Sequence, residues 1–141
     1  MERGVRRGFS LAELLAALVV LGLLLIAFKG IGAWIERERV SSDVNKIYTL
    51  VSAYRVKALN EEKEYAIAGS EGEKEIAICE GSSCTKETAE KIVSLNNPLK
   101  SDFLLKIGKK GTSNRLSICL DTPIEPNCVI VSNLSQRIGS K

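Results

Sequence analysis

The stretch RRGFSLAELLAALVVLGLLLIAF, residues 6–28, decides the organisation of this 141-residue chain. From Phe9 to Phe28 it carries no charged side chain except the carboxylate of Glu13. As a helix, this apolar run would cover roughly 30 Å at about 1.5 Å per residue, which is the thickness of the hydrocarbon core of a bilayer. The run therefore predicts a single membrane-spanning helix.

The flanks of the apolar run indicate its orientation. Arg3, Arg6 and Arg7 precede it, so the positive-inside tendency places the N-terminus in the cytoplasm and the rest of the chain beyond the membrane. A secretory signal peptide has the same basic start and apolar core, but no Ala-x-Ala cleavage site directly follows Phe28, and helix-compatible sequence continues. We therefore expect an anchored chain.

The sequence after the apolar run predicts that the helix continues. Apolar residues recur there at steps of four and three, at Val40, Val44, Ile47, Val51, Tyr54 and Ala58. This spacing places them on one face of a helix, with charged residues on the other faces. No proline occurs between residues 9 and 97, so the apolar run and the stripe can form one helix that ends near Leu59.

The rest of the chain predicts one small head domain. Thr85 can cap a short helix from Lys86 to about Leu95. Three β-like runs follow, at Phe103 to Ile107, Leu116 to Leu120 and Cys128 to Ser132. Their turn-rich connections predict an antiparallel meander, and the stripe of the long helix can cover its apolar face.

The predicted fold class is therefore α+β, with a long N-terminal helix packed on a small antiparallel β-sheet. We expect a leader peptide at residues 1–8, a transmembrane and assembly segment at residues 9–35, and a globular head at residues 36–141. A single head is what the remaining length allows.

The composition excludes several classes of function. The chain has no His, which excludes Ser-His-Asp and Cys-His catalysis and His-ligated zinc. The net charge of +3 gives no reason to expect nucleic-acid binding. The sequence contains no D-x-D-x-D run, which would indicate a calcium site. We interpret the basic residues near a predicted hairpin as a solvated surface: Lys106, Lys109, Lys110 and Arg115. We expect no catalytic residue, no cofactor and no metal.

Four cysteines lie beyond the apolar run, at Cys79, Cys84, Cys119 and Cys128. They allow either a zinc site or two disulfides. Structural zinc usually binds cysteine pairs separated by two to four residues, whereas the second pair has the spacing C-x8-C with prolines between its members. We therefore expect two disulfides, paired locally with crossed pairings left open, and an oxidising compartment beyond the cytoplasmic membrane.

The segment Arg6-Arg7-Gly8-Phe9-Ser10-Leu11-Ala12-Glu13-Leu14-Leu15 resembles the processing site of type IV prepilins and of type II secretion pseudopilins. The shared pattern is a short basic leader that ends in Gly, an aromatic residue, a Glu four residues further, and a long apolar helix. The resemblance implies that a membrane prepilin peptidase cuts after Gly8 and methylates the new N-terminus at Phe9. The pair Cys119 and Cys128 also resembles the disulfide that closes the C-terminal region of many pilins.

The resemblance suggests an assembly role for Glu13. A charged side chain inside hydrocarbon is costly, so its presence indicates a function. Cleavage creates an ammonium on Phe9, which the carboxylate of another subunit can neutralise, and such a pair would set the register of a polymer. The alternative is that Glu13 lies shallow in the headgroups and reaches water.

Together these residues predict a type IV pilin-like structural subunit that polymerises into a pilus filament, and no enzyme. Its expected partners are the prepilin peptidase, identical or related pilin subunits, and an inner-membrane assembly platform. We expect a single-pass inner-membrane protein before assembly and an extracellular or periplasmic filament afterwards. One alternative is a pseudopilin of a type II secretion system, and another is a solitary membrane-anchored binding domain.

Overall fold

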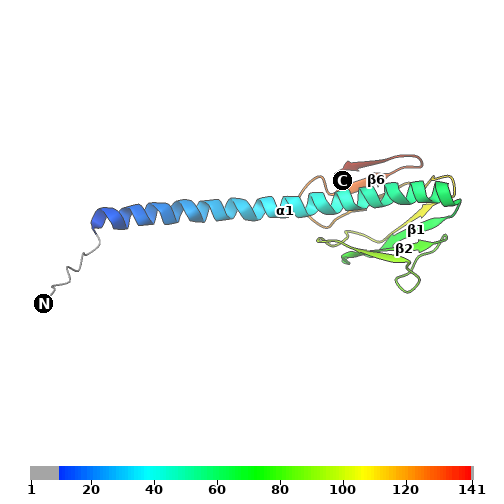
Figure 1. Ribbon diagram of the computed structural model, residues 1–141, viewed down its shortest axis with the longest axis horizontal. Coiled ribbons are helices and arrows are strands. Elements are labelled where there is room, and N and C mark those ends of the chain that lie inside the picture. Colours follow the sequence, from blue (N-terminus) through cyan, green and yellow to red (C-terminus); the bar gives the residue numbers. More distant parts are fainter. Residues whose placement is uncertain (1–9, 141) are drawn as a thin grey trace. The chain divides into compact units, whose positions relative to one another are not determined.

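A computed structural model of the chain describes residues 10–140, apart from the side chain of Lys29. The chain divides into two compact units, Met1–Glu36 and Arg37–Lys141. The first element is a single helix, α1 (Leu11–Glu61), as the sequence predicts (Figure 1). The helix ends where Glu62 adopts a left-handed backbone with φ 54°, which stops the i to i+4 hydrogen-bond pattern.

The described residues contain seven strands after α1, and they form two antiparallel sheets. The four-stranded sheet has the order β3-β2-β1-β4, and the three-stranded sheet has the order β5-β6-β7. The strands are β1 (Tyr65–Gly69), β2 (Glu75–Glu80), β3 (Lys91–Ser94), β4 (Phe103–Ile107), β5 (Leu116–Cys119), β6 (Cys128–Val131) and β7 (Gln136–Gly139). The predicted α+β class is confirmed, with two sheets in place of one small sheet.

The prediction of a short helix from Lys86 to about Leu95 is wrong. Residues Lys91–Ser94 form the edge strand β3, in which Ile92 lies opposite Ala77 of β2. Pairing with β2 outweighs the capping signal, because β-branched residues such as those of β3 fit a strand well. Thr85 instead begins a turn, in which its backbone N–H donates to the Thr88 hydroxyl at 3.2 Å.

The predicted meander of three strands is wrong for its first strand, whereas the antiparallel pairing of its second and third strands is confirmed. Strand β4 pairs with β1, in the register Ile67 to Leu105, and so belongs to the first sheet. Strand β5 pairs with β6, and β6 pairs with β7. The segment between β4 and β5 therefore connects the four-stranded sheet to the three-stranded sheet.

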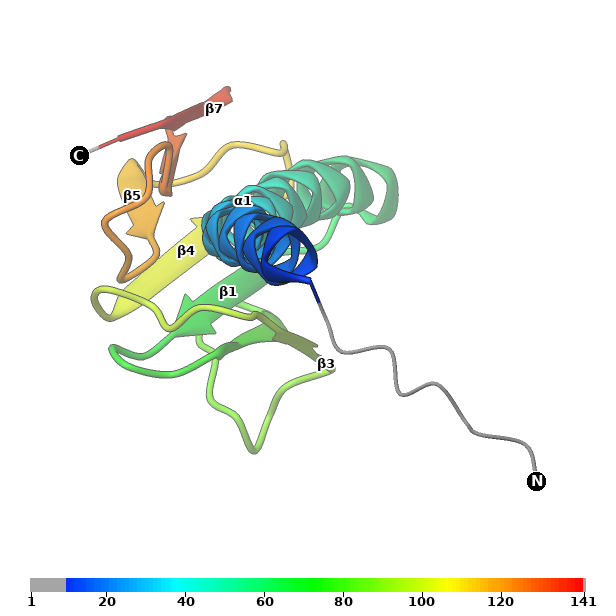
Figure 2. The same ribbon diagram turned by 90° about the vertical axis from the view of Figure 1, so that its left-hand side faces the viewer.

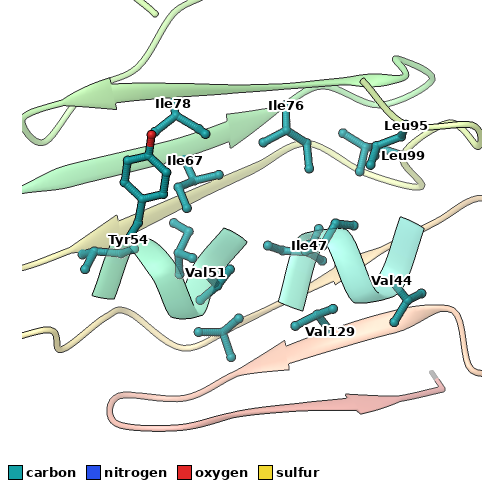
Figure 3. Close-up of a cluster of buried hydrophobic side chains, with 14 of the residues drawn as sticks. Val44, Ile47, Val51, Tyr54, Ile67, Ile76, Ile78, Leu95, Leu99 and Val129 are labelled. Carbon is teal, nitrogen blue, oxygen red and sulfur yellow. The ribbon is translucent and has the colours of Figure 1, made fainter. Parts of the chain in front are cut away.

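The hydrophobic core of the unit Arg37–Lys141 is built around the second part of α1. The predicted stripe is buried along its whole length, from Val40 to Ala58. Figure 3 shows its side chains between the two sheets, with Ile76 and Ile78 on one side and Val129 on the other. Figure 2, which looks close to the axis of α1, shows the sheets on different sides of the helix. This part of α1 is therefore a core element shared by both sheets.

A buried carboxylate ties α1 to the loop that follows β3. Asp43 is fully buried and accepts hydrogen bonds at 2.9 Å from the backbone N–H groups and side-chain amides of Asn96 and Asn97. Lys46, one turn further along α1, lies 4.0 Å from the carboxylate. Hydrogen bonds to a charged group are among the stronger ones in proteins, so Asp43 fixes this loop on the helix.

A buried guanidinium ties α1 to the three-stranded sheet. Arg55 is 8% exposed and donates to the hydroxyl of Ser113 at 2.7 Å and to the carbonyl oxygens of Ser132 and Ser135. Burial lowers the pKa of the Arg55 guanidinium, although an arginine remains protonated in proteins. The β6–β7 turn is thereby held on the helix by a cation.

Two disulfides reinforce the unit Arg37–Lys141. Cys79 and Cys84 close the start of the β2–β3 loop, and Cys119 and Cys128 join opposing positions of β5 and β6. The β2–β3 loop is held further by Lys86, whose ammonium lies 2.9 Å from Glu73 and 3.1 Å from Glu75. Cross-links of this kind restrict the unfolded chain.

Candidate functional site

The first part of α1 exposes a continuous apolar surface. Its large side chains from Leu11 to Ile35 are between 39% and 78% exposed. An 18-residue window of the helix has a mean hydropathy of 2.7, and none of it is buried. By length and composition, α1 can therefore cross a membrane. A surface of this size needs cover from lipid or from other helices.

Helix α1 begins with two reciprocal hydrogen bonds between Ser10 and Glu13. The backbone N–H of Ser10 donates to Oε2 of Glu13 at 2.9 Å, and the backbone N–H of Glu13 donates to the Ser10 hydroxyl at 3.3 Å. The Ser10 carbonyl accepts the first helical hydrogen bond, from Leu14, at 3.1 Å.

This arrangement is a capping box, with Ser10 as the N-cap residue and Glu13 three residues later. Each side chain accepts from a backbone N–H that has no partner within the helix. The Glu13 carboxylate also lies at the positive end of the helix dipole, where a negative charge is favoured. In the described residues, the carboxylate is therefore occupied by its own chain.

The other predicted site residues are placed differently. Gly8 and Phe9 lie outside the described residues. The four cysteines belong to the unit Arg37–Lys141 and take no part in the Ser10–Glu13 contact. Within residues 10–140, no group of three or more acidic or cysteine side chains is arranged to hold a metal ion.

Ser10 is the capping partner of Glu13, and it was not identified from the sequence. The signal was present, because the pattern S-x-x-E directly before an apolar run is typical of a capping box. Glu13 stands out in the sequence by its charge, and its spacing of three residues from Ser10 is the additional signal. The two residues act as one unit at the start of the helix.

Comparisons with known proteins bear on this same segment. Residues 3–28 match the family model for the prokaryotic N-terminal methylation motif. The match covers the basic leader, the Ser10–Glu13 pair and the apolar run. No curated protein and no solved structure matches the chain. The chain therefore carries the prepilin leader of type IV pilins and pseudopilins, and this leader, joined to a pilin-like α+β fold, supports a pilin-like or pseudopilin-like precursor.

Proposed function

We propose that the chain is the precursor of a structural subunit of a type IV pilus. Prepilin peptidase cuts after Gly8 and methylates Phe9, and the mature subunit polymerises through its apolar helix. The observation that carries this proposal is the motif match over residues 3–28, which leads directly into a helix with an exposed apolar surface. The motif marks structural subunits, which are not enzymes, and we assign no catalytic activity to the chain.

The domain organisation that fits this function has a leader at residues 1–8, a membrane and assembly segment at residues 9–35, and a head at residues 36–141. Arginines ahead of the apolar run support a cytoplasmic N-terminus, and the two disulfides support a head beyond the inner membrane. The partners in this scheme are the peptidase, identical or related subunits, and an inner-membrane assembly platform. The finished filament lies outside the cell or in the periplasm.

Glu13 has an assembly role in this proposal. Its carboxylate pairs with the Phe9 amine of a neighbouring subunit, which neutralises two charges in the apolar centre of the filament. A desolvated pair of this kind gains little net stability, but a carboxylate without its partner is strongly unfavourable there. The pair therefore selects the register at which subunits meet.

The two disulfides favour a pilus over the pseudopilus of a type II secretion system. A pilus extends into the surroundings of the cell, where cross-links that restrict the unfolded chain stabilise a small domain. Recovery of the protein in sheared cell-surface filaments would support the pilus. Loss of protein secretion on deletion of its gene, without any surface filament in the wild type, would support the pseudopilus.

Processing is tested by the mass of the mature chain. The wild-type protein should begin at Phe9, and Gly8→Val should retain the leader because a peptidase that fits Gly has no space for a branched side chain. Gly4→Val is the matched control, because it changes another glycine of the leader and should be processed normally. A wild-type chain that still begins at Met1 would refute the proposal.

Assembly is tested by Glu13→Ala. This variant should insert into the membrane at least as well as the wild type, because an apolar side chain is cheaper in hydrocarbon, but it should yield few filaments. Glu36→Ala is the control, since it removes an exposed carboxylate beyond the apolar run. Filaments of Glu13→Ala at wild-type abundance would favour the alternative in which Glu13 lies shallow and reaches water.

A further inference from the structure

We propose that the heads of neighbouring subunits join edge to edge through strands β3 and β7. The open edge of β3 on one subunit receives the open edge of β7 from a second copy of the chain, with the two strands parallel. The four-stranded sheet of one subunit and the three-stranded sheet of the next then form one continuous sheet. The inference rests on the proposed function, because polymerisation supplies the second copy.

The two sheets have four outer edges, and those of β4 and β5 are covered by the chain itself. The Asn114 side chain accepts from the Lys106 backbone N–H at 2.7 Å and donates to the Leu104 carbonyl at 3.0 Å, which covers the edge of β4. At the edge of β5, the backbone N–H of Lys100 donates to the Cys119 carbonyl at 2.9 Å. Nothing comparable lies on β3 or β7 within residues 10–140, so these two edges are available for pairing.

The hydrogen-bond pattern of β3 identifies the free backbone groups at its edge. Successive residues of an antiparallel strand direct their backbone groups alternately towards the partner strand and away from it. The backbone N–H of Leu95, just after β3, donates to the Lys74 carbonyl at 2.7 Å, in line with the register of β2 and β3. By this alternation, the backbone N–H and C=O groups of Ile92 and Ser94 point away from β2.

The same alternation identifies the free backbone groups of β7. The backbone N–H of Ser132 donates to the Ser135 carbonyl at 2.8 Å, in line with the register of β6 and β7. The backbone groups of Gln136 and Ile138 therefore point away from β6. Each edge offers donors and acceptors at alternate residues, which is the spacing that a parallel pair of strands requires.

Strand β3 runs antiparallel to α1. Glu90, just before β3, has its carboxylate 3.3 Å from the Lys57 ammonium. Asn96, just after β3, donates to the Asp43 carboxylate from its backbone and from its side chain. The strand therefore starts beside a later residue of α1 and ends beside an earlier one.

Strand β7 also runs antiparallel to α1. The carbonyl of Ser135, just before β7, accepts from Arg55, and the side chain of the next residue, Gln136, donates to the backbone carbonyl of Tyr48. In the proposed function, every subunit enters the filament from the same membrane in the same orientation, so the helices of neighbours are parallel. Strand β3 of one subunit and β7 of the next then run the same way, as a parallel pair requires.

The faces of the two sheets agree with parallel pairing. A parallel pair that uses all the free groups places Ile92 level with Arg137, and Val93 level with Ile138, on shared faces. Val93 packs against the core, and Ile138 lies opposite the buried Val129 of β6, so both belong to the face that α1 covers. Parallel pairing therefore places the helices of both subunits on one face of the joined sheet, whereas antiparallel pairing of Ile92 with Ile138 would place them on opposite faces.

A groove beside β3 provides room for the incoming strand. It has a volume of about 650 Å³ and lies between α1 and β3, where Leu50, Ala53 and Val93 are among its lining residues. Ile138 is 39% exposed in the single subunit. In the joined sheet, Ile138 of the second copy lies next to Val93 on the groove side, and burial of this apolar side chain favours association.

The test is disulfide cross-linking in sheared filaments of the double variant Ile92→Cys/Arg137→Cys. Paired strands lie about 4.8 Å apart, within the range that a disulfide bridges. Strands β3 and β7 of one subunit lie on different sides of α1, so a link must join two subunits (Figure 2). After mild oxidation, a non-reducing gel should show at least tenfold more multimers than either single variant gives. A double variant that stays monomeric in intact filaments would overturn the proposal.

A matched double variant, Ile92→Cys/Ile138→Cys, tests the register. Its two thiols lie on opposite faces of the joined sheet, because neighbouring side chains of a strand alternate. It should cross-link only at the level of the single variants. Stronger linking of this pair than of Ile92→Cys/Arg137→Cys would indicate antiparallel strands and would overturn the proposal. A double variant that does not assemble alone is carried into filaments by wild-type subunits, and cross-linked dimers then replace the larger multimers.

Proline at the edge of β3 gives a second measurement. Ile92→Pro removes a backbone N–H that faces the open edge, so the subunit should keep its fold, which circular dichroism in detergent checks. Its filaments should release subunits at a lower temperature than wild-type filaments. Ile92→Val is the control, because it keeps the N–H and should leave the release temperature unchanged. A folded Ile92→Pro subunit whose filaments are as stable as the wild type would overturn the proposal.

Failure of this inference is distinguishable from failure of the proposed function. A wild-type chain that forms no filament would overturn both proposals. Wild-type filaments whose subunits show no link between Ile92→Cys and Arg137→Cys would overturn the joined sheet alone. The cross-linking experiment on sheared filaments therefore decides between the two cases.

Discussion

Replacing Asp43 by Ala should destabilise the unit Arg37–Lys141 by about 2–4 kcal/mol. The change removes the acceptor of two backbone N–H groups and two side-chain amides, all at 2.9 Å. The side chains of Asn96 and Asn97 can turn to water, but the two backbone groups are fixed by the loop. Each unsatisfied backbone group costs about 1–3 kcal/mol, and loss of the buried charge offsets part of the sum.

Urea unfolding of the isolated unit, residues 37–141, measures this loss by circular dichroism. With an m-value of about 1.5 kcal/mol/M, the midpoint should fall by roughly 1–3 M. Glu38→Ala is the control, because it removes an exposed carboxylate from the same helix and should change stability by less than about 0.5 kcal/mol. If Asp43→Ala lowered the free energy of unfolding by less than about 1 kcal/mol, the argument that these hydrogen bonds fix the loop would be refuted.

Two other predictions concern ionisation and reduction of the same unit. Its stability to urea should fall as the pH rises above about 10. Burial raises the pKa of Tyr54, and a hydrogen bond to Glu61 raises the pKa of Tyr65. In the unfolded chain both phenol groups titrate near pH 10. Because the pKa is raised in the folded state, the contribution of these two tyrosines to the free energy of unfolding is complete below pH 10 and is lost above it. Ultraviolet absorbance follows the ionisation of the tyrosines in the folded unit. If every tyrosine ionised near pH 10, the prediction would be contradicted. A mild reductant without denaturant should open Cys79–Cys84 first, because Cys84 is partly exposed while the cysteines of the other disulfide are 7% and 1% exposed. Alkylation and mass mapping report the order, and simultaneous opening of both disulfides would count against it.

The helix could be predicted from the sequence because its signals are local. The stripe from Val40 to Ala58 has helical spacing, and no proline interrupts it. Its residues are buried in the structure, as that spacing predicts. The edge strands β3 and β7 carry much weaker signals, since each has four residues and β7 has Ile138 as its one large apolar residue. Such strands are defined by pairing with a neighbour that the sequence does not identify.

The buried charges of α1 could not be predicted for a related reason. Asp43, three residues after Val40, and Arg55, four residues after Val51, lie at the two edges of the apolar stripe, where a charged side chain can reach either water or the core. Their burial comes from loops that are distant in sequence, around Asn96 and around Ser132. Glu13 stands out because it interrupts an apolar run, and the pairing of Ser10 with it could have been predicted from the S-x-x-E spacing, which the structure bears out with two hydrogen bonds.

The position of α1 between two sheets has a consequence for a broken chain. A protease that cuts at the exposed residues Lys109 and Lys110 separates the four-stranded sheet from the three-stranded sheet in sequence. The released C-terminal piece would still pack on α1 through Val129 and its neighbours, and its Ser132 carbonyl would still accept from Arg55. The connection between β4 and β5 is therefore a natural split point, at which two fragments expressed separately should associate and restore the fold without a covalent link.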